Sequence, residues 1–428
     1  MSLFDCRFFG DGSSSGLRAV LPVEKQVDLG VASDYLLFGK KDHSRRTFFR
    51  GVRQEWEFPS FSHSRDTRRV RYGDVSGFDE ELACVLDDGL GSGVKLSCLS
   101  GGLDSSAIVG LTGVDSVSAV FEENLEEDFI DDVVEYNDIQ GDKLFLSASD
   151  VVKCLDDVIG VQGEPFRSLS VVAEYLLYKK VGRDSVFCGQ GADELLGGYE
   201  YFWPLYCKWL AGRIGPFALA EWARVFSHNK IGLAGFFFHS LPFALRRRIA
   251  AGRLDGVVSP VESGERFRVG GLFDVLDGHL RWDSLPELLN YARRNAGAFR
   301  TSVVHPFLDE RVVEASASLP LGGKFYRGWN KYVLRLVSDG FVPVSVRRRR
   351  RKVGFSVPED SWLRDGELAD VLVGGFDGFE ESVLVDWGVV GASFDRWLAG
   401  DSCGGLSGRD FFRFYCYGRW KELMEVEE

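Results

Sequence analysis

The sequence has few of the side chains from which structural metal sites are built. Only six histidines occur among its 428 residues, and no two of its eight cysteines form a C-x-x-C pair. Zinc sites use such closely spaced ligands, so the sequence argues against a structural zinc ion. Free thiols scattered through a core are typical of a reducing compartment, which predicts a cytoplasmic protein.

A signal peptide and a membrane-spanning run are also missing. The first residues, MSLFDCRFFGDGSSSG, lack a charged start followed by an apolar core, so no secretory signal is expected. The most apolar window, residues 231–248, is interrupted by His239 and Pro242 and is too short to span a bilayer. We expect buried helices there and no membrane partner, with attachment to a membrane surface as the alternative.

The sequence has fewer basic than acidic residues. Lysine and arginine number 51 against 64 acidic residues, which gives a net charge of −13. This balance argues against a nucleic-acid partner. The local exception is the run Arg347–Arg351, which is typical of a solvated face or a nucleic-acid patch. The role of this run stays open.

Strand-like and helix-like segments alternate between residues 93 and 200. Short apolar, β-branched runs occur at 93–99, 114–121, 142–148 and 184–189, with helical stretches between them. This order predicts an α/β fold with a doubly wound parallel sheet. Mostly helix is expected from 205 to 340 and again from 355, with turns around Gly374–Gly375 and Gly404–Gly405. The C-terminal half is therefore expected to be largely helical.

Two glycine-rich loops follow predicted strands, SGGLDSS at 100–106 and GQGADE at 189–194. Ligands of a parallel sheet collect beyond the carboxyl ends of its strands, so both loops should face one pocket. Glycines, serine hydroxyls and the N-terminus of the following helix suit a pyrophosphate. No lysine follows the glycines, so the first loop is not a Walker loop. The alternative is an ordinary Ser-Gly-Gly turn.

Each loop carries an acid. Asp104 beside a phosphate requires a bridging cation, and Mg²⁺ serves that purpose. Asp193 would bind the same ion from the second loop, because Mg²⁺ with a polyphosphate takes only one or two carboxylates. For Glu194 the alternative is a helix-capping role.

A lysine follows the arginine run. Lys352 precedes Gly354 and Phe355, and a turn that buries Phe355 would direct the lysine inward. There it would stabilise charge on the α-phosphate as pyrophosphate leaves. The segment HPFLD, residues 305–309, favours a structural turn with a helix cap at Asp309.

Four motifs, in order and spacing, resemble the synthetase domain of the asparagine synthetase family, whose members are ATP pyrophosphatases of the PP-loop type. They are SGGLDSS, GQGADELLGGY, HPFLD and K-V-G-F at 352–355. The resemblance covers roughly residues 76–428 and implies an adenine nucleotide alpha hydrolase-like domain. SGGLDSS alone would also fit GMP synthetase or a tRNA-thiolating enzyme, so the four motifs together make the likeness specific.

The resemblance implies an AMP-forming amide ligase that uses ATP and Mg²⁺. In the family a carboxylate attacks the α-phosphate of ATP, pyrophosphate leaves, and an amine displaces AMP from the acyl-adenylate. The implied partners are aspartate or another small carboxylate, ammonia or an amine, and in one version a separate glutaminase subunit. Asp104 and Asp193 match the metal ligands, while Lys352 and Gln190 match catalytic positions. The implied ATP- and pyrophosphate-binding residues are Leu99, Ser100, Gly101, Gly102, Leu103, Asp104, Ser105, Ser106, Ala119, Cys188 and Gly189.

Residues 27–53 are similar to the segment that closes the family's N-terminal glutaminase domain. We therefore expect a degenerate glutaminase remnant and linker over residues 1–75, followed by the synthetase domain over 76–428. A class II glutaminase needs a cysteine directly after the initiator methionine. Here Ser2 follows Met1, and Cys6 is internal. No glutamine hydrolysis is expected.

Two positions depart from the family pattern at its acyl-acceptor end. Gln190 stands where the family usually has glutamate, and Val304 where it often has arginine. A glutamine cannot accept a proton at neutral pH. Gln190 therefore either hydrogen-bonds free ammonia or marks an unusual substrate, as in relatives that make β-lactams or peptide macrolactams.

Three functions follow from these patterns. The first is an amide ligase that uses ammonia, and the second is a ligase that joins a carboxylate to a substrate amine, as in lactam or peptide cyclisation. The third is a nucleotide-binding pseudoenzyme or regulator. The presence of Asp104, Asp193 and Lys352 argues against the third, because a dead site has no need for a metal pair.

Overall fold

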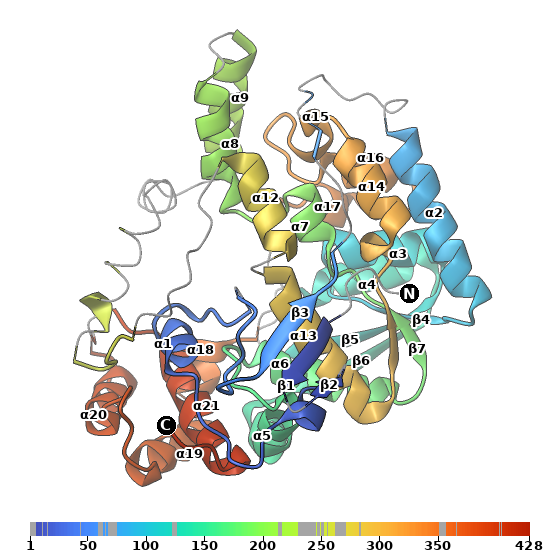
Figure 1. The fold of residues 1–428 in the computed structure, drawn as a ribbon. Coiled ribbons are helices and arrows are strands. Elements are labelled where there is room, and N and C mark those ends of the chain that lie inside the picture. Colours follow the sequence, from blue (N-terminus) through green and yellow to red (C-terminus); the bar gives the residue numbers. More distant parts are fainter. Residues whose placement is uncertain are drawn as a thin grey trace.

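The computed structural model describes residues 6–10, 12–14, 16–42, 44–58, 63–64, 66, 75–121, 126–212, 216–229, 245, 249, 252–254, 256–261, 271–281, 284–350, 357–364, 366–401, 403 and 405–428 (Figure 1). Within these ranges no helix is long and apolar enough to cross a membrane. The helices expected at 231–248 lie outside the described residues, except for Leu245.

Five short strands form a parallel sheet in the order β6-β5-β4-β7-β8. Their bounds are β4 (Leu96–Cys98), β5 (Asp115–Phe121), β6 (Gly141–Leu146), β7 (Ser185–Phe187) and β8 (Ser302–Val304). The predicted α/β fold with a parallel sheet is confirmed. Strand β8 was not predicted, because its three residues lie in a stretch where helix was expected and show no alternating pattern of their own.

Helices cover both faces of this sheet (Figure 1). Successive side chains of a strand point to opposite faces. Val120 and Phe187 accordingly join one hydrophobic cluster, while Val117 and Val186 join another. The first cluster includes α2 (Ser76–Gly91), α3 (Leu103–Thr112), α4 (Glu127–Asn137) and α14 (Glu310–Ser318). The second includes α5 (Ala148–Gln162), α6 (Ser170–Val181), α13 (Ser284–Phe299) and α21 (Gly408–Met424).

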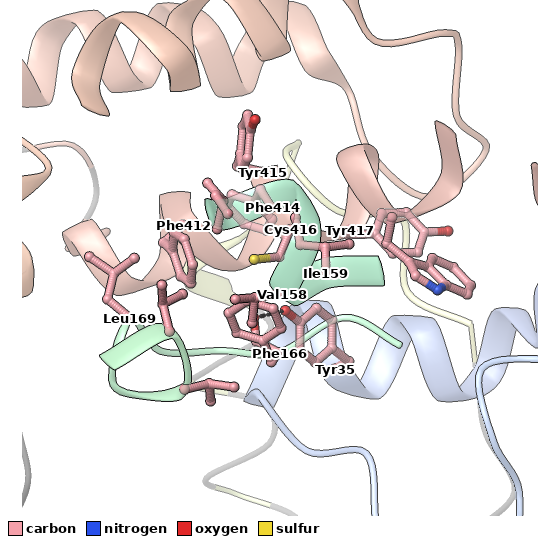
Figure 2. Packing of buried hydrophobic residues seen from close by; sticks show 14 of the residues in the cluster. Tyr35, Val158, Ile159, Phe166, Leu169, Phe412, Phe414, Tyr415, Cys416 and Tyr417 are labelled. Carbon is pink, nitrogen blue, oxygen red and sulfur yellow. Dashed lines mark hydrogen bonds between the residues drawn. The ribbon is translucent and has the colours of Figure 1, made fainter. Parts of the chain in front are cut away.

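The N-terminal segment packs on the second cluster. It contains β1 (Cys6–Gly10), β2 (Gly12–Ser14), a short 3-10 helix η1 (Leu17–Val20), α1 (Leu29–Phe38) and β3 (Arg53–Trp56). The three strands form an antiparallel sheet in the order β2-β1-β3. Tyr35 of α1 lies against Phe166, and its hydroxyl donates a hydrogen bond to the Phe166 carbonyl at 2.7 Å (Figure 2). The division at residue 75 and the glutaminase interpretation of this segment stay predictions.

The rest of the described chain is largely helical, as expected. Its elements are α7 (Ala192–Leu196), α8 (Phe202–Ala211), α9 (Pro216–Asn229), α12 (Leu272–Arg281), η3 (Pro306–Leu308), α15 (Leu321–Lys324), α16 (Tyr332–Val337), α17 (Val344–Arg347), α18 (Glu359–Trp362), α19 (Gly366–Gly378) and α20 (Trp387–Leu398). The turn expected at Gly374–Gly375 was wrong, because both glycines lie inside α19. A Cβ at Gly375 would lie within 2.9 Å of the rings of Tyr415 and Phe379, so this glycine allows close helix packing.

Candidate active site

The two glycine-rich loops meet where the order of the sheet reverses. β4 and β7 are neighbours, and the sheet extends from β4 to β5 and β6 on one side and from β7 to β8 on the other. Doubly wound sheets bind ligands beyond the carboxyl ends of their strands at such a switch point. The SGGLDSS loop continues from β4 and the GQGADE loop from β7, and both line one cavity. The structure therefore brings the two loops together as predicted.

The first loop is held against the start of α3 by its own serine side chains. Ser105 Oγ accepts a hydrogen bond from the Ser100 N–H at 3.2 Å, which closes the loop onto the start of α3. Gly101 has φ +70°, and a Cβ there would lie 3.0 Å from the Glu126 carbonyl oxygen. Gly102 precedes α3 without any side-chain cap. The first N–H groups of the helix are therefore available for an anion.

The second loop lies tightly against the first. A Cβ at Gly189 would lie 3.1 Å from both Asp104 Cβ and the Ser105 nitrogen. Gly191 has φ +95°, and a Cβ there would overlap the side chain of Leu308. Only glycine combines this backbone angle with this lack of space. The spacing of the two loops thus depends on the absence of side chains at these positions.

Lys331, which sequence analysis did not single out, lies between the two predicted metal ligands. Its Nζ is 2.7 Å from Asp104 Oδ1 and 2.6 Å from Asp193 Oδ1. The side chain of Lys331 is only 6% exposed. Gly198 makes room for this arrangement, since a Cβ there would overlap both Lys331 Cε and Asp193 Oδ1. Two carboxylates from separate loops therefore reach a single cation position.

This cation position fits Mg²⁺. Carboxylate oxygens are its preferred protein ligands, and with a polyphosphate it uses only one or two of them. Asp104 and Asp193 supply that number and already converge on the ammonium of Lys331. Over the described ranges, no group of three or more His, Cys, Asp or Glu side chains converges as a metal site, so this position offers two protein ligands. The residues present thus suit a metal that is shared with a bound polyphosphate.

A basic wall stands beside the first loop. The guanidinium carbons of Arg335 and Arg350 lie 4.7 and 3.5 Å from the ring centroid of Trp329. Burial lowers the pKa of Arg335 to about 10, which leaves the group charged at neutral pH. Arg349 pairs with the buried Glu126 at 2.9 Å, and the three arginines line the cavity. Part of the arginine run is therefore directed at the site and not at bulk solvent.

One cavity of about 1160 Å³ contains most of the predicted site. Its lining includes the predicted residues Leu99, Ser100, Gly102, Leu103, Asp104, Ser105, Ala119, Cys188, Gly189, Gln190 and Asp193. Gly101 and Ser106 do not line it, and Ser106 is fully buried. Lys352 lies outside the described residues, so its inward direction stays a prediction.

Glu194 does not cap the helix that follows. It lies in the first turn of α7 but is 1% exposed, and it accepts hydrogen bonds from Tyr199 Oη at 2.6 Å and Ser284 Oγ at 2.9 Å. Nearby, Tyr201 stacks on Tyr199 with ring centroids 5.1 Å apart. These side chains form an aromatic wall of the cavity with a carboxylate behind it.

Gln190 presents an amide to the cavity. Its Oε1 is buried and has no hydrogen-bond partner in the described part of the chain. A buried carbonyl oxygen without a partner costs about 1–3 kcal/mol, which a donor from a ligand would recover. The side chain is therefore suited to accept an N–H bond from a bound molecule.

Glu174 is a further acid in the cavity wall, and the sequence did not indicate it. Burial, and next to it the charge of Cys188, raises the pKa of Glu174 to about 8. Asn295 Nδ2 donates to Glu174 Oε2 at 3.1 Å. The carboxyl is thus held protonated at neutral pH, in the same cavity as the two glycine-rich loops.

We expect the stability of the protein to fall as the pH rises from about 4.5 to about 8, because folded Glu174 keeps a proton that the unfolded chain loses. The slope is at most about 1.4 kcal/mol per pH unit. Glu174→Gln should flatten this part of the profile, as measured by urea unfolding at several pH values. Glu314→Gln, on the exposed face of α14, is the control. An unchanged slope in Glu174→Gln would contradict the assignment.

Comparison with known proteins agrees with this geometry. Residues 89–377 match the family described as "Asparagine synthase". The "Putative asparagine synthetase [glutamine-hydrolyzing]" of Mycobacterium tuberculosis (strain ATCC 25618 / H37Rv) is 28% identical over 363 residues, which cover 76% of this chain and 55% of the relative. "Asparagine synthetase [glutamine-hydrolyzing] 1" of Bacillus subtilis (strain 168) is 25% identical over 302 residues, which cover 63% and 47%.

The chain spans about half the length of these curated relatives. The family match begins at residue 89, so it does not reach the segment 27–53, whose likeness to a glutaminase domain stays a prediction. It does include the SGGLDSS loop, the GQGADE loop and Lys331. On the extent of this match, the chain belongs to the asparagine synthase family.

Proposed function

We propose that this protein is an ATP-dependent amide ligase that adenylates a substrate carboxylate and passes the acyl group to ammonia or an amine. One observation carries the proposal. Asp104 and Asp193 converge on a cation at the switch point of the sheet, beside a glycine-serine loop that opens a helix. That arrangement suits a metal-bound pyrophosphate, which is the leaving group of an adenylation.

The first step needs charge stabilisation more than proton transfer. A carboxylate oxygen attacks the α-phosphorus of ATP, and the bond from that phosphorus to the bridging oxygen of the β-phosphate breaks. Ser100, Ser105 and the first N–H groups of α3 hold the departing pyrophosphate. Lys331 donates hydrogen bonds to its oxygens as negative charge grows, and the charge of Arg335 adds to the stabilisation. Asp104 and Asp193 would hold Mg²⁺ in place of the Lys331 ammonium, and the ion would supply further positive charge to the leaving group.

Lys352 has a distinct role in this proposal. Its charge would act on the α-phosphate, whereas Lys331 acts on the pyrophosphate. The basic wall of Arg335 and Arg350 orients the triphosphate. The adenosine lies along Leu99, Ala119 and Cys188, where the cavity is lined by the ends of the central strands.

In the second step the amine attacks the acyl carbon, AMP leaves, and one proton of the amine passes to solvent. The Gln190 amide oxygen accepts an N–H bond from that amine, because it is buried and lacks another partner in the described residues. A glutamine cannot take the amine's proton. The amine therefore has to arrive neutral, and ammonia supplied at the site or a substrate amine meets this condition.

A substrate amine larger than ammonia is the second candidate. The cavity of about 1160 Å³ is slightly larger than the roughly 300–1,000 Å³ of typical small-molecule pockets. Its aromatic wall of Tyr199 and Tyr201 offers flat apolar surface. A carboxylate and an amine on one elongated substrate would use this space, which corresponds to lactam or peptide cyclisation.

No glutaminase activity is proposed for this chain. Cys6 is 1% exposed, and burial raises the pKa of its thiol to about 12. A thiol in this environment is not ionised at neutral pH and makes a poor nucleophile. Ammonia would then come from solution or from a separate glutaminase subunit.

The test measures pyrophosphate release from ATP in the presence of Mg²⁺. Aspartate and ammonium are each added or left out, and other carboxylates and amines are then tested in their place. Release that depends on aspartate and ammonium, with asparagine formed, is expected for the first candidate. Release with a different acid, unaffected by ammonium, would favour the second candidate. Glutamine should not replace ammonium. Failure of every carboxylate to stimulate release would contradict the proposal.

A further inference from the structure

Two cysteines lie side by side at the switch point. β4 pairs with β7 in parallel register, Leu96 opposite Val186 and Ser97 opposite Phe187. The next residue on each strand is a cysteine, Cys98 and Cys188. Neighbouring strands run about 4.8 Å apart, so the two Cα atoms fall within the roughly 4.4–6.8 Å range of a disulfide.

Both thiols are open to small molecules. Cys98 and Cys188 line the cavity and are partly exposed, whereas the buried cysteines are Cys6, Cys154, Cys207, Cys403 and Cys416. Cys84 is exposed, on α2, and lies outside the cavity lining. A small oxidant that enters the cavity therefore meets two neighbouring thiols.

The two thiols differ in ionisation. A hydrogen bond from the Cys98 thiol is the largest influence that lowers the pKa of Cys188 well below its ordinary value, and His305 acts in the same direction. The same contact raises the pKa of Cys98. A thiolate next to a second thiol is the usual arrangement of a redox-sensitive cysteine and its resolving partner.

We propose that Cys98 and Cys188 are a dithiol that a hydroperoxide oxidises to a disulfide, and that this bond switches off nucleotide binding. The Cys188 sulfur attacks the peroxide oxygen, gives a sulfenic acid and releases water or an alcohol. The Cys98 sulfur then attacks the Cys188 sulfur, and water leaves. The two thiols lose two electrons and two protons, and the peroxide takes them up.

The position of the bond explains its effect on the site. Leu99 and the SGGLDSS loop follow Cys98 directly, and Gly189 and Gln190 follow Cys188. A disulfide fixes its Cβ atoms about 3.8 Å apart, so closing the bond draws the two strand ends together. Gly189 already lies against Asp104 and Ser105, with no space to absorb that shift. The consequence for nucleotide binding rests on the proposed function, whereas formation of the disulfide does not.

The experiment treats the reduced, full-length protein with hydrogen peroxide, with and without Mg²⁺-ATP. Peptides are then mapped by mass spectrometry without reduction, and binding of a fluorescent ATP analogue is measured on the same samples. We expect a linked peptide that joins Cys98 to Cys188, its suppression by Mg²⁺-ATP, and at least a tenfold loss of analogue binding that dithiothreitol reverses. Cys98→Ser should abolish both the link and the reversible loss, and Cys84→Ser is the matched control.

The outcomes separate the two claims. Oxidation of Cys188 to sulfinic acid in the wild-type protein, with no linked peptide, overturns the dithiol. A linked peptide with unchanged analogue binding overturns the switch. If the reduced protein fails to bind the analogue at all, the proposed function fails, and the peptide map still decides whether the dithiol exists. The mapping is made on the wild-type protein, so it does not depend on the folding of a variant.

Discussion

Asp104→Asn should reduce carboxylate-dependent pyrophosphate release by about 100-fold or more, the scale on which removal of one preorganised charge-stabilising group acts. The neutral amide keeps the shape of the carboxylate and still accepts a hydrogen bond from Lys331, which lies 2.7 Å away. It loses the charge that a metal ion requires. Release of pyrophosphate under saturating ATP, over a range of Mg²⁺ concentrations, is the measurement.

The control for this change is Asp131→Asn. Asp131 also pairs with a lysine, Lys143, at 2.6 Å, but on the surface and away from the cavity. Its replacement should leave release within a factor of two. Equal effects of the two substitutions, or full activity of Asp104→Asn, would mean that Asp104 does not act on the leaving group.

Lys331→Met should destabilise the protein by about 3–5 kcal/mol in the absence of metal, because it leaves two largely buried carboxylates facing one another without their cation. Added Mg²⁺ should restore part of this loss, since an ion that binds only the folded state stabilises it. Urea unfolding with increasing Mg²⁺, without nucleotide, measures both effects. This readout tests the metal position independently of activity.

Lys143→Met is the matched control. Lys143 also joins two carboxylates, those of Glu127 and Asp131, but the acids are 38% and 57% exposed. Such surface pairs contribute about 0–1 kcal/mol, so the change should be small and independent of Mg²⁺. If Mg²⁺ leaves the stability of Lys331→Met unchanged, Asp104 and Asp193 do not form a metal site.

The two loops could be predicted from the sequence because their signals are local. The glycine and serine pattern of SGGLDSS shows where a backbone turns, and the runs at 114–121 and 184–189 show where strands lie. Parallel sheets bind ligands beyond the carboxyl ends of their strands. This rule predicts that the two loops, although distant in sequence, line one pocket. The motif HPFLD is also a local signal. As expected, Asp309 caps α14, and its side chain accepts a hydrogen bond from the Arg311 N–H.

Lys331 could not be predicted in this way. It follows the residues Gly-Trp-Asn, which carry no motif, and has φ +48°, a conformation that tertiary contacts impose. One of these contacts is a hydrogen bond from Asn330 Nδ2 to the Gly198 carbonyl at 2.7 Å. Glu194 differs from expectation for the same reason, because its partner Ser284 comes from α13, far along the chain.

The central claim is that the chain cleaves ATP between its α- and β-phosphates. The measurement that tests it most directly is the identity of the nucleotide formed when the purified protein turns over ATP with its carboxylate substrate. We expect AMP and pyrophosphate in equal amounts, one of each for every amide made. ADP and inorganic phosphate would contradict it, because the cation at Asp104 and Asp193 would then not be placed for a pyrophosphate leaving group.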